Sequence, residues 1–380
     1  MERFWIFKRL FIILIISVLL FENSYVKGMD ISAKSAVLIC ADTGSILWGK
    51  EENKERPMAS TTKIMTALLT LEQAQASDID VEITDEMVRV EGTSMGLMPG
   101  DIVKLESLAK GMLLPSGNDA ANAAAITLAG SKENFATVMN EKAKQIGMKN
   151  TKFVTPSGLD SGNHHSTAYD MAILGAFAME NELFANIASK KNLKVSFVKP
   201  EKSIILHNHN KLLKLYDGCI GIKTGFTKAA GRCLVSCAEK NGVRLVAVTL
   251  NAPSDWDDHI KLYNYGFQNT VNKVFDDRGF KISLNVYNGE ESGVIGCGAT
   301  CFDRNFKIGD EAKVERKMEI PEKIEAPIER GQIIGKVVYY LNGKEIGENN
   351  IISEQDINKK QVKKNMFNRI MDFIKNIFRK

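Results

Sequence analysis

The chain has 380 residues, of which 44% are hydrophobic and 25% are charged. This composition is normal for globular proteins and excludes a disordered or collagen-like chain, and the length is sufficient for two domains. The net charge of +4 is unevenly distributed, because residues 359–380 carry +7 and residues 1–28 carry +2, which leaves −5 on the body between them. A body with a net negative charge argues against a nucleic-acid partner.

The first 28 residues resemble an export signal. Arg3, Lys8 and Arg9 form a basic start, and Leu10–Phe21 is a continuous apolar run that ends shortly before the small residue Gly28. This order is typical of a secretory signal peptide over residues 1–28. An uncleaved membrane anchor is the alternative, although the apolar run is short for a membrane span. In either case, we expect the body of the chain on the outer face of the cytoplasmic membrane.

The body begins with a hairpin followed by a buried helix. Ser35–Ile39 and Gly44–Trp48 are β-prone runs separated by a turn signal, which predicts a β-hairpin. After Pro57, a helix is expected that is apolar nearly all round and should therefore be buried. Ser60 opens this helix, and Lys63 lies three residues later, on the same face.

The middle of the chain alternates between helices and one short loop. Helical patterns over residues 105–130 are interrupted by a proline and a glycine, so Ser116 and Asn118 are expected on a connecting loop. Asp119 is a candidate cap of the alanine-rich helix that follows. Tyr169–Ala188 is predicted to form a further helix.

Short strands dominate the next segment. Val195–Leu206 has the pattern of strand and turn, and Gly221–Thr227 begins three successive strand-like runs that continue through Leu234–Ala238 and Leu245–Leu250. An Asn-Gly pair between the last two is a strong hairpin signal, which predicts an antiparallel meander. A helix over Trp256–Phe267 follows. Helices placed between an early hairpin and a later meander predict an α+β fold in which helices pack on an antiparallel sheet.

A second domain is expected after the first. The pattern changes to short alternating runs at Lys281–Tyr287, Glu311–Glu315 and Lys336–Leu341. These runs predict a small all-β domain over residues 273–353, after a first domain over residues 29–272. We expect the β-domain to hold the first domain at a distance from the C-terminal tail.

The C-terminal segment 354–380 is predicted to form an amphipathic helix. Apolar residues recur on one helical face at Val362, Met366, Ile370, Phe373, Ile374 and Ile377. Because the same segment is strongly basic, it is typical of a helix that anchors an exported protein to the membrane surface. A helix docked on the body of the chain or on a partner is the alternative.

The cysteines and histidines do not indicate a metal site. The six cysteines could form disulfides in an exported protein, but the sequence does not select a pairing. Two pairs have a spacing that occurs in metal sites, namely Cys233 with Cys237 and Cys297 with Cys301, but scattered thiols are the preferred interpretation. The five histidines form no helical metal pair. We therefore expect neither a metal nor a cofactor.

Three short motifs carry the chemistry, in the order Ser60-Thr61-Thr62-Lys63, Ser116-Gly117-Asn118 and Lys223-Thr224-Gly225. Each alone is weak evidence, but together they indicate acyl transfer without a histidine. A serine hydroxyl needs a base during attack, and no Ser/His/Asp set is apparent from the spacing. Lys63 can act as that base if burial and a neighbouring cation such as Lys223 lower its pKa enough to make the amine neutral.

Each motif also has an ordinary structural interpretation. Ser60 could be a helix cap, Lys63 a solvated lysine, Ser116 part of a plain turn, and Lys223 an exposed edge-strand lysine. We prefer the catalytic interpretation because a buried apolar helix has little reason to hide an unpaired lysine. In that case the Ser116 hydroxyl can relay a proton between the leaving amine and Lys63.

The other polar residues of the motifs suit substrate binding. The amide of Asn118 can hold Lys63 or a substrate carbonyl. Lys223 and Thr224 offer an amine and a hydroxyl side by side, which suits a substrate carboxylate. Gly225 would allow the substrate backbone to approach the strand closely.

With these motifs, the chain resembles the D-alanyl-D-alanine carboxypeptidases, which are low-molecular-mass penicillin-binding proteins of the S11 peptidase type. The similar segments are Ala59–Ala67, Gly92–Leu97, Leu113–Ala121, Ser166–Met171, Lys223–Thr227, Ala326–Ile328 and Val338–Lys344. The resemblance covers nearly all of residues 30–353, and one departure is Thr155, where the family often has asparagine. It implies a transpeptidase-like domain of the serine β-lactamase and penicillin-binding type, followed by a small all-β domain.

The resemblance also implies roles for individual residues. Ser60 would form the acyl-enzyme, Lys63 would accept its proton, and Ser116 would shuttle a proton. The backbone N–H groups of Ser60 and Phe226 would form the oxyanion hole.

The implied partners follow from the binding residues. Asn118 would position the substrate, and Lys223, Thr224 and Gly225 would bind its terminal carboxylate. The substrate would be a peptidoglycan stem peptide that ends in D-Ala-D-Ala, and β-lactam antibiotics would bind covalently.

Two other functions are weighed against the carboxypeptidase. A serine β-lactamase needs a glutamate-activated water, and Glu180–Leu183 resembles part of such a segment, although Phe184 stands where asparagine is expected. A non-catalytic penicillin-binding sensor is the second alternative. All the reactive residues named above are present, so the carboxypeptidase is preferred.

Overall fold

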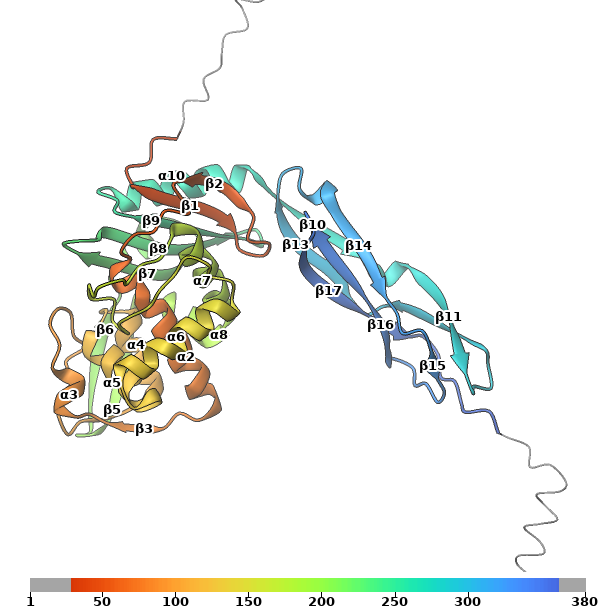
Figure 1. Cartoon of the computed structure of the whole chain (residues 1–380), viewed down its shortest axis with the longest axis horizontal. Helices are drawn as coiled ribbons and strands as arrows, with labels where there is room; N and C mark the ends of the chain where they lie inside the picture. The colour runs from red at the N-terminus through yellow and green to blue at the C-terminus, as the bar shows by residue number, and fades with distance from the viewer. Residues whose placement is uncertain (1–28, 362–380) are drawn as a thin grey trace, which may run out of the picture. The chain divides into compact units, whose positions relative to one another are not determined.

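The computed structural model describes residues 29–361 (Figure 1). The predicted signal peptide over residues 1–28 and the amphipathic helix pattern from Val362 onward therefore lie outside the described residues. Within the described part, residues after Ser353 are not helical, because Ile357 and Lys359 form β-bridges to Ile328 and Gly289. None of the helices in residues 29–361 is long and apolar enough to cross a membrane.

The contacts divide the chain into two compact units. The first unit contains the residues up to Val37 together with Gly49–Ser236 and Ala247–Tyr265, and the second contains Leu38–Trp48, Cys237–Val246 and the residues from Gly266 onward. The predicted boundary between residues 272 and 273 remains a prediction.

A five-stranded sheet is built from the predicted hairpin and meander. It has the order β2-β1-β9-β8-β7 and comprises β1 (Ser35–Cys40), β2 (Ile46–Lys50), β7 (Cys219–Thr227), β8 (Gly231–Lys240) and β9 (Val243–Leu250). The turn between β8 and β9 contains Asn241 and Gly242, with φ angles of 52° and 77°. Two consecutive positive φ angles are what a tight hairpin of this type requires, so the Asn-Gly signal is confirmed.

The residues between Ala59 and Gln268 also form helices. They are η1 (Ala59–Thr62), α2 (Lys63–Ala76), α3 (Asp85–Val88), α4 (Leu105–Leu113), α5 (Asn118–Ala129), α6 (Lys132–Gln145), α7 (Ala168–Glu180), α8 (Glu182–Ala188), α9 (Leu212–Leu215) and α10 (Asp255–Gln268). Figure 1 shows α10 along one face of the sheet and α2, α7 and α8 on the other side. Helix α2 is buried on nearly every turn, as its apolar sequence predicted.

Two predicted helices differ in detail from the observed ones. The helix expected to open at Ser60 begins at Lys63, because residues 59–62 form a 3₁₀ turn. The helix expected over Tyr169–Ala188 is broken at Asn181, whose side chain accepts a hydrogen bond of 3.0 Å from the N–H of Phe184. Asn181 thus caps a second helix, a role to which asparagine is well suited.

A second, four-stranded sheet in the first unit was only partly predicted. It has the order β3-β4-β5-β6 and comprises β3 (Asp80–Glu82), β4 (Ile102–Lys104), β5 (Asn192–Lys199) and β6 (Lys202–His207). The β5–β6 hairpin corresponds to the strand and turn expected over residues 195–206. The short strands β3 and β4 give too weak a sequence pattern to be found.

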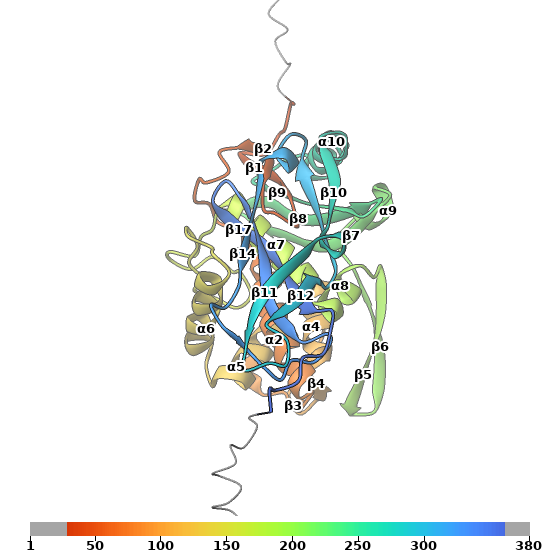
Figure 2. The same ribbon diagram turned by 90° about the vertical axis from the view of Figure 1, so that its right-hand side faces the viewer.

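The second unit is rich in β-strands. Its strands are β10 (Thr270–Asp276), β11 (Lys281–Tyr287), β12 (Gly293–Gly298), β13 (Cys301–Lys307), β14 (Val314–Glu319), β15 (Ile324–Glu325), β16 (Ile333–Leu341) and β17 (Lys344–Ser353). They form a pair β10-β13 and a six-stranded sheet of order β14-β16-β17-β12-β11-β15, and Figure 2 shows β11, β12 and β17 running side by side. The strand expected over Glu311–Glu315 is wrong in part, since residues 311–313 form the 3₁₀ turn η3 before β14.

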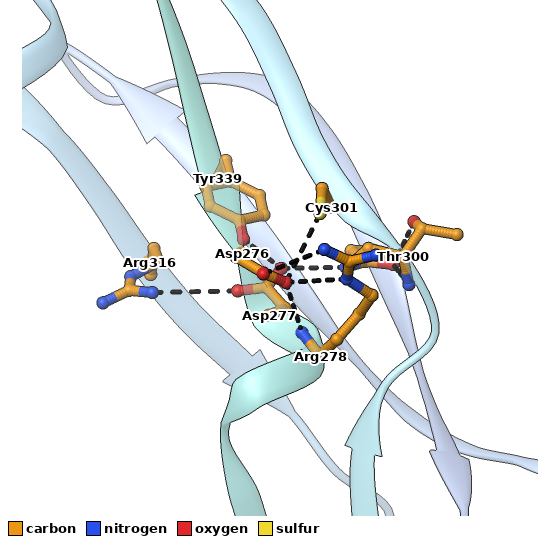
Figure 3. A network of polar contacts seen from close by, with 8 residues as sticks. Asp276, Asp277, Arg278, Thr300, Cys301, Arg316 and Tyr339 are labelled. Carbon is orange, nitrogen blue, oxygen red and sulfur yellow. Dashed lines mark hydrogen bonds and ion pairs between the residues drawn. The ribbon is translucent and has the colours of Figure 1, made fainter.

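A buried carboxylate organises one part of this unit (Figure 3). Asp277 accepts hydrogen bonds from the hydroxyl of Tyr339 and from the amide of Asn349, the latter at 2.9 Å. Its second oxygen lies 3.7 Å from Nη1 of Arg316. Beside it, Asp276 pairs with Arg278 at 2.9 Å on the surface. Each acceptor of the buried group thus faces a donor, as buried polar groups require.

The six cysteines are free thiols. Cys40, Cys233 and Cys237 are buried, and Cys219, Cys297 and Cys301 are partly buried. No disulfide is therefore needed to account for the fold of residues 29–361.

Candidate active site

Ser60 and Lys63 lie together at the start of α2. Nζ of Lys63 lies 3.0 Å from Oγ of Ser60 and donates a hydrogen bond of 2.7 Å to the carbonyl oxygen of Ser157. The predicted one-turn spacing thus brings the amine to the hydroxyl. The Lys63 side chain is completely buried, so its amine has exchanged water for these protein partners.

The buried amine is displaced from its usual ionisation. Burial lowers the pKa of Lys63 well below the usual range, and the neighbouring cation of Lys223 lowers it further, while Asp119 opposes both effects. Burial lowers the pKa of Lys223 to about 7. Because both burial and a second cation act on Lys63, whereas burial alone acts on Lys223, the amine of Lys63 loses its proton more readily than that of Lys223.

The strand β7 passes close to the nucleophile turn. A Cβ atom at Gly225 would lie 3.0 Å from the backbone nitrogens of Ser60 and Thr61, and 3.1 Å from the carbonyl oxygen of Met58. Any side chain would therefore push the strand away from the turn. The prediction attributed Gly225 to close approach of a substrate, whereas the structure shows that the glycine also lets β7 approach Ser60.

Lys223 lies two residues before Gly225 on this strand and is buried. Its Nζ donates a hydrogen bond of 3.0 Å to the carbonyl oxygen of Thr224 and lies 3.5 Å from the Thr224 hydroxyl. It is therefore not the exposed edge lysine of the structural alternative. The amine and the hydroxyl lie side by side, as a carboxylate site would need.

Ser116 is held in a conformation that non-glycine residues rarely adopt, with a φ angle of 66°. The hydroxyl of Thr93 donates a hydrogen bond of 2.6 Å to the Ser116 carbonyl, and the N–H of Gly117 donates to the carbonyl of Gly111 at 2.8 Å. The surrounding chain thus fixes this residue against its local preference, a feature that occurs at functional sites.

Asn118 differs in two respects from its prediction. It is the first residue of α5 rather than a loop residue, and its Nδ2 donates to the carbonyl of Glu91 at 2.7 Å, while the hydrogen bonds described for Lys63 go to Ser60 and Ser157 instead. The other expected role, a bond to a substrate carbonyl, stays a prediction. Its Oδ1 is buried and, within the described residues, accepts no hydrogen bond. An acceptor left without a donor in a native fold indicates a ligand or water partner.

Asp119 does not cap α5, because Gly117 occupies the cap position. Its carboxylate accepts hydrogen bonds from the backbone N–H groups of Met95 at 3.0 Å and Leu97 at 3.1 Å, and from the hydroxyl of Ser94. The carboxylate therefore anchors the preceding loop to the start of α5. This loop also carries Thr93, the partner of Ser116.

A cavity of about 500 Å³ opens onto these residues. Among the predicted residues it is lined by Ser60, Ser116, Thr224, Gly225 and Phe226. The two backbone groups expected to form the oxyanion hole therefore belong to residues that border one cavity. The three motifs, far apart in the sequence, meet at a single place within the first unit.

The sequence analysis missed part of the cavity wall. Thr93, His209, Arg232, Asp255 and Trp256 also line it. Nε and Nη2 of Arg232 bond to the buried carboxylate of Asp255 at 3.0 and 2.6 Å. These two residues come from the start of β8 and the start of α10, so only the tertiary fold brings them together, and no local pattern could have found them.

The glutamate segment considered for a β-lactamase lies elsewhere. Glu180 is the last residue of α7 and is exposed, and Glu182 begins α8. No glutamate is among the residues that line the cavity. The segment is thus part of the junction between α7 and α8.

Comparison with known families agrees with this geometry. A family profile described as D-alanyl-D-alanine carboxypeptidase matches residues 22–254. The chain belongs to the D-alanyl-D-alanine carboxypeptidase family. A second profile, described as the C-terminal domain of penicillin-binding protein 5, matches residues 276–359. The predicted family is confirmed, as are the α+β domain and the all-β domain that follows it in the sequence. The chain is a serine carboxypeptidase of the hydrolase class.

Curated relatives and solved structures extend over most of the chain. It is 32% identical over 338 residues to the D-alanyl-D-alanine carboxypeptidase DacF of Bacillus subtilis, covering 86% of each chain. It is also 32% identical to DacC of Escherichia coli, covering 92% of this chain and 89% of that one. Penicillin-binding protein 5 of Haemophilus influenzae has a similar structure, with a TM-score of 0.66 and 31% identity over 87% of this chain and 98% of that one. A Streptomyces K15 DD-transpeptidase variant matches with a TM-score of 0.60 and 31% identity, over 63% of this chain and 99% of that one.

Proposed function

We propose that the chain removes the terminal D-alanine from peptidoglycan pentapeptide through an ester formed on Ser60. The observation that carries this proposal is the fully buried amine of Lys63, 3.0 Å from the Ser60 hydroxyl. A buried amine with a lowered pKa is a base, and a serine hydroxyl beside it is an activated nucleophile. The family, shown by the comparisons, supplies the reaction class.

In the acylation step, neutral Lys63 accepts the proton as Ser60 attacks the carbonyl carbon of the penultimate D-alanine. One amine N–H donates to the carbonyl of Ser157 at 2.7 Å. This bond orients the amine so that its lone pair can face Ser60. The positive charge that forms on Lys63 is transient, because the site disfavours it.

The leaving D-alanine needs a proton on its nitrogen. Ser116 borders the same cavity as Ser60, and its backbone is held in place by the loop around Thr93. We assign to its hydroxyl the relay of the proton from Lys63 to the leaving amine. The bond broken is the terminal peptide bond, and water later cleaves the ester to regenerate Ser60.

Substrate binding is assigned to residues around the cavity. The terminal carboxylate binds at Lys223 and Thr224, whose amine and hydroxyl are adjacent. The unpartnered Oδ1 of Asn118 accepts an N–H group of the peptide. The backbone N–H groups of Ser60 and Phe226 stabilise the oxyanion, a contribution worth about 3 kcal/mol for one donor. Gly225 leaves space for the peptide backbone.

β-lactam antibiotics are proposed as covalent ligands of the same serine. A β-lactam carries a carboxylate and a reactive carbonyl, so it would use the Lys223 region and Ser60 together. A serine β-lactamase releases the drug with a water that a glutamate activates, and among the described residues those that line the cavity include no glutamate. This observation favours the carboxypeptidase over the β-lactamase.

The cellular location is part of the proposal. The predicted signal over residues 1–28 would export the chain, and the basic amphipathic pattern over residues 354–380 would attach it to the outer face of the cytoplasmic membrane. In this arrangement, residues 29–272 perform the reaction and residues 273–353 connect them to the anchor. A chain that ends at Gln361 retains every described residue, so loss of vesicle binding by this chain with full activity supports the anchor. Undiminished binding to vesicles with anionic lipids contradicts it.

The catalytic proposal is tested with Ser60→Ala. We expect this variant to lose both D-alanine release from a D-Ala-D-Ala peptide and labelling by fluorescent penicillin, with mass spectrometry locating the label on Ser60 of the unmodified chain. Labelling that persists in Ser60→Ala contradicts the proposal. Labelling of the unmodified chain without D-alanine release would favour a sensor, and rapid release of hydrolysed drug would favour a β-lactamase.

A further inference from the structure

The imidazole of His164 lies behind the nucleophile and has two different partners. Its Nδ1 accepts a hydrogen bond of 2.9 Å from the backbone N–H of Val154 and a longer one of 3.4 Å from that of Thr155. Backbone N–H groups can only donate, so Nδ1 carries no proton and the neutral ring carries its proton on Nε2. Burial, and secondarily the neighbouring His165, lower the pKa of His164 to about 4, which agrees with a neutral ring.

The protonated side of the ring leads to the nucleophile turn. Nε2 of His164 lies 2.8 Å from the hydroxyl of Thr62, and this hydroxyl donates to the carbonyl of Ala59 at 2.8 Å. Because the Thr62 proton is used for Ala59, the hydroxyl must accept the proton of Nε2. The chain of donors therefore has a single direction, from His164 through Thr62 to Ala59.

Ala59 is the residue directly before Ser60 and has a φ angle of 50°. Alanine rarely adopts this conformation, so the surrounding structure must hold it. The Ala59 carbonyl is fixed by the Thr62 hydroxyl, and Gly158 packs so closely against it that a Cβ atom there would clash with this carbonyl. The Thr62 hydroxyl, to which His164 donates, thus fixes the backbone of Ala59 and with it the orientation of the next residue, Ser60.

The unprotonated side of the ring leads to the base. The segment that begins at Val154 continues to Pro156 and Ser157, whose carbonyls accept hydrogen bonds from Thr66 at 2.6 Å and from Lys63 at 2.7 Å. By accepting from Val154, His164 holds the start of the segment that presents the Ser157 carbonyl to the Lys63 amine. One imidazole therefore joins the backbone that orients Ser60 to the backbone that orients Lys63.

We propose that His164, in its neutral form with the proton on Nε2, is a positioning residue for acylation. It holds the Ser60 hydroxyl and the Lys63 amine in position relative to each other. It is not among the residues that line the cavity, so it acts through Thr62 and through the segment after Val154 rather than on the substrate. No proton passes through it during the reaction. This inference rests on the proposed function of Ser60 and Lys63.

A positioning role predicts a particular kinetic signature. The proposed carboxylate site at Lys223 and Thr224 is on β7, and the hydrogen bonds described for His164 go to Thr62, Val154 and Thr155 instead. Removing the link should therefore lower the acylation rate and kcat while KM for the peptide stays nearly constant. A residue that only stabilised the fold would lower the amount of active protein and would leave the rate per active molecule unchanged.

The experiment compares Thr62→Val, which keeps the shape but removes the hydroxyl, with Thr62→Ser, which keeps the hydroxyl. We expect Thr62→Val to lower the second-order rate of Ser60 labelling by fluorescent penicillin by roughly tenfold to a hundredfold, because small misplacements of reacting groups have effects of this size. Thr62→Ser should stay near the rate of the unmodified chain. Rates are expressed per folded molecule, with the folded fraction measured by circular dichroism and thermal unfolding.

Two His164 variants test the two ring nitrogens separately. His164→Gln can place an amide N–H near the position of Nε2, and His164→Asn can place a carbonyl oxygen near the position of Nδ1. Each should restore part of the rate relative to His164→Ala. His165→Gln is the control, since the adjacent ring has no contact with Thr62 in the hydrogen bonds described, and it should label at the normal rate.

The decisive variant combines Thr62→Val with His164→Asn, because both changes remove the bond between Nε2 and Thr62 and both leave an acceptor near the position of Nδ1. If His164 acts through Thr62, the double variant should be no slower than the slower single variant, because coupled residues are not additive. Rates that multiply, or an unchanged rate in Thr62→Val, overturn the inference. Should Thr62→Val fail to fold, the labelling rates of His164→Gln and His164→Asn test the inference instead. If both variants are labelled as fast as the unmodified chain, the inference is overturned. If the unmodified chain itself is not labelled on Ser60, the proposed function fails instead.

Discussion

The active site of the first unit and the Asp277 cluster of the second bury charged groups in opposite ways. In the first unit, the amines of Lys63 and Lys223 are buried, and their hydrogen-bond partners are hydroxyl and carbonyl oxygens rather than carboxylates. In the second unit, Asp277 is equally buried, but its oxygens face Tyr339, Asn349 and Arg316 (Figure 3). The first arrangement leaves a charge without compensation, and the second compensates it.

The difference has a chemical consequence. Burial and the neighbouring Lys223 lower the pKa of Lys63, and the more distant charge of Asp119 only partly opposes them, so the amine loses its proton readily and can act as a base. A buried carboxylate surrounded by donors remains an acceptor and holds its neighbours in place. The same cost of desolvation thus produces reactivity in one unit and rigidity in the other. The following changes test whether this division is real.

The largest effect is expected for Lys63→Met. Methionine fills a similar volume but supplies no base, so we expect penicillin acylation to fall by roughly a hundredfold to ten-thousandfold, the usual contribution of a general base. Because a poorly compensated amine is also removed from the interior, the variant should unfold at the same or a higher temperature. Stopped-flow labelling and thermal unfolding measure the two quantities.

The matched control for Lys63→Met is Lys110→Met. Lys110 is a helix lysine that is paired with Glu106 at 2.7 Å. This variant should keep the normal acylation rate, with a small loss of stability at most. A Lys63→Met variant that acylates at the normal rate would show that the buried amine is not the base.

The next effect is the response of the two units to acid. Burial lowers the pKa of His164 to about 4 and that of His259 to about 3, from a usual value of 6.5. Both rings therefore bind protons more readily in the unfolded chain, so the stability of the first unit should fall as the pH drops from about 6.5 toward 4. Each ring contributes a slope of at most about 1.4 kcal/mol per pH unit.

Hydrogen exchange measured by mass spectrometry can follow each unit separately during this titration. All five histidines of the chain lie in the first unit, so the second unit should be insensitive to pH in this range as far as histidines are concerned. Equal acid sensitivity of the β16 and β17 peptides would contradict the comparison.

Replacement of the compensated carboxylate tests the second unit. In Asp277→Asn, an amide group would face donors, and the buried partners would lose a charged acceptor. We expect the free energy of unfolding of the second unit to fall by about 1–3 kcal/mol, with penicillin acylation unchanged. Asp303→Asn is the control, because Asp303 is exposed and accepts a hydrogen bond of 2.7 Å from Asn272. A loss of acylation in Asp277→Asn would mean that the two clusters are not independent.

The sequence allowed prediction of features that are encoded locally. The Asn-Gly turn between β8 and β9 and the one-turn spacing of Ser60 and Lys63 follow from neighbouring residues, and both are found. Asp119 shows the limit of this approach. An aspartate at a helix start is most simply predicted to be a cap, but here it binds the loop at Met95, which only the tertiary structure brings near.

The supporting residues of the site could not be predicted for the same reason. His164 is separated from Thr62 by 102 positions, so no periodicity or spacing connects them. Gly225 was predicted to allow the close approach of a substrate, which stays a prediction, but the contact that the structure shows is with backbone atoms of the nucleophile turn. The sequence motifs therefore predicted which side chains react, and the structure shows what holds them in position.

The smallest effect concerns Arg232 and Asp255 at the cavity wall, where a buried carboxylate is paired with a partly exposed cation. The guanidinium is half exposed and the carboxylate is buried, with 2.6 Å between Nη2 and Oδ1. Burial raises the pKa of Asp255, and the bond from Arg232 opposes this effect. Arg232→Gln leaves the carboxylate beside an anionic substrate without its cation, so we expect KM to rise about two- to fivefold with kcat nearly constant.

Adding Asp255→Asn to Arg232→Gln should return KM toward the normal value, because the repelling carboxylate is then removed as well. Arg244→Gln breaks a pair with Glu239 of similar length, 2.8 Å, among residues that do not line the cavity, and it should leave KM unchanged. Recovery of KM in the double variant would show that Arg232 serves to neutralise the Asp255 carboxylate at the cavity wall. A KM that stays high would instead show that the guanidinium itself binds the substrate, and the cavity would then contain a second uncompensated cation besides Lys223.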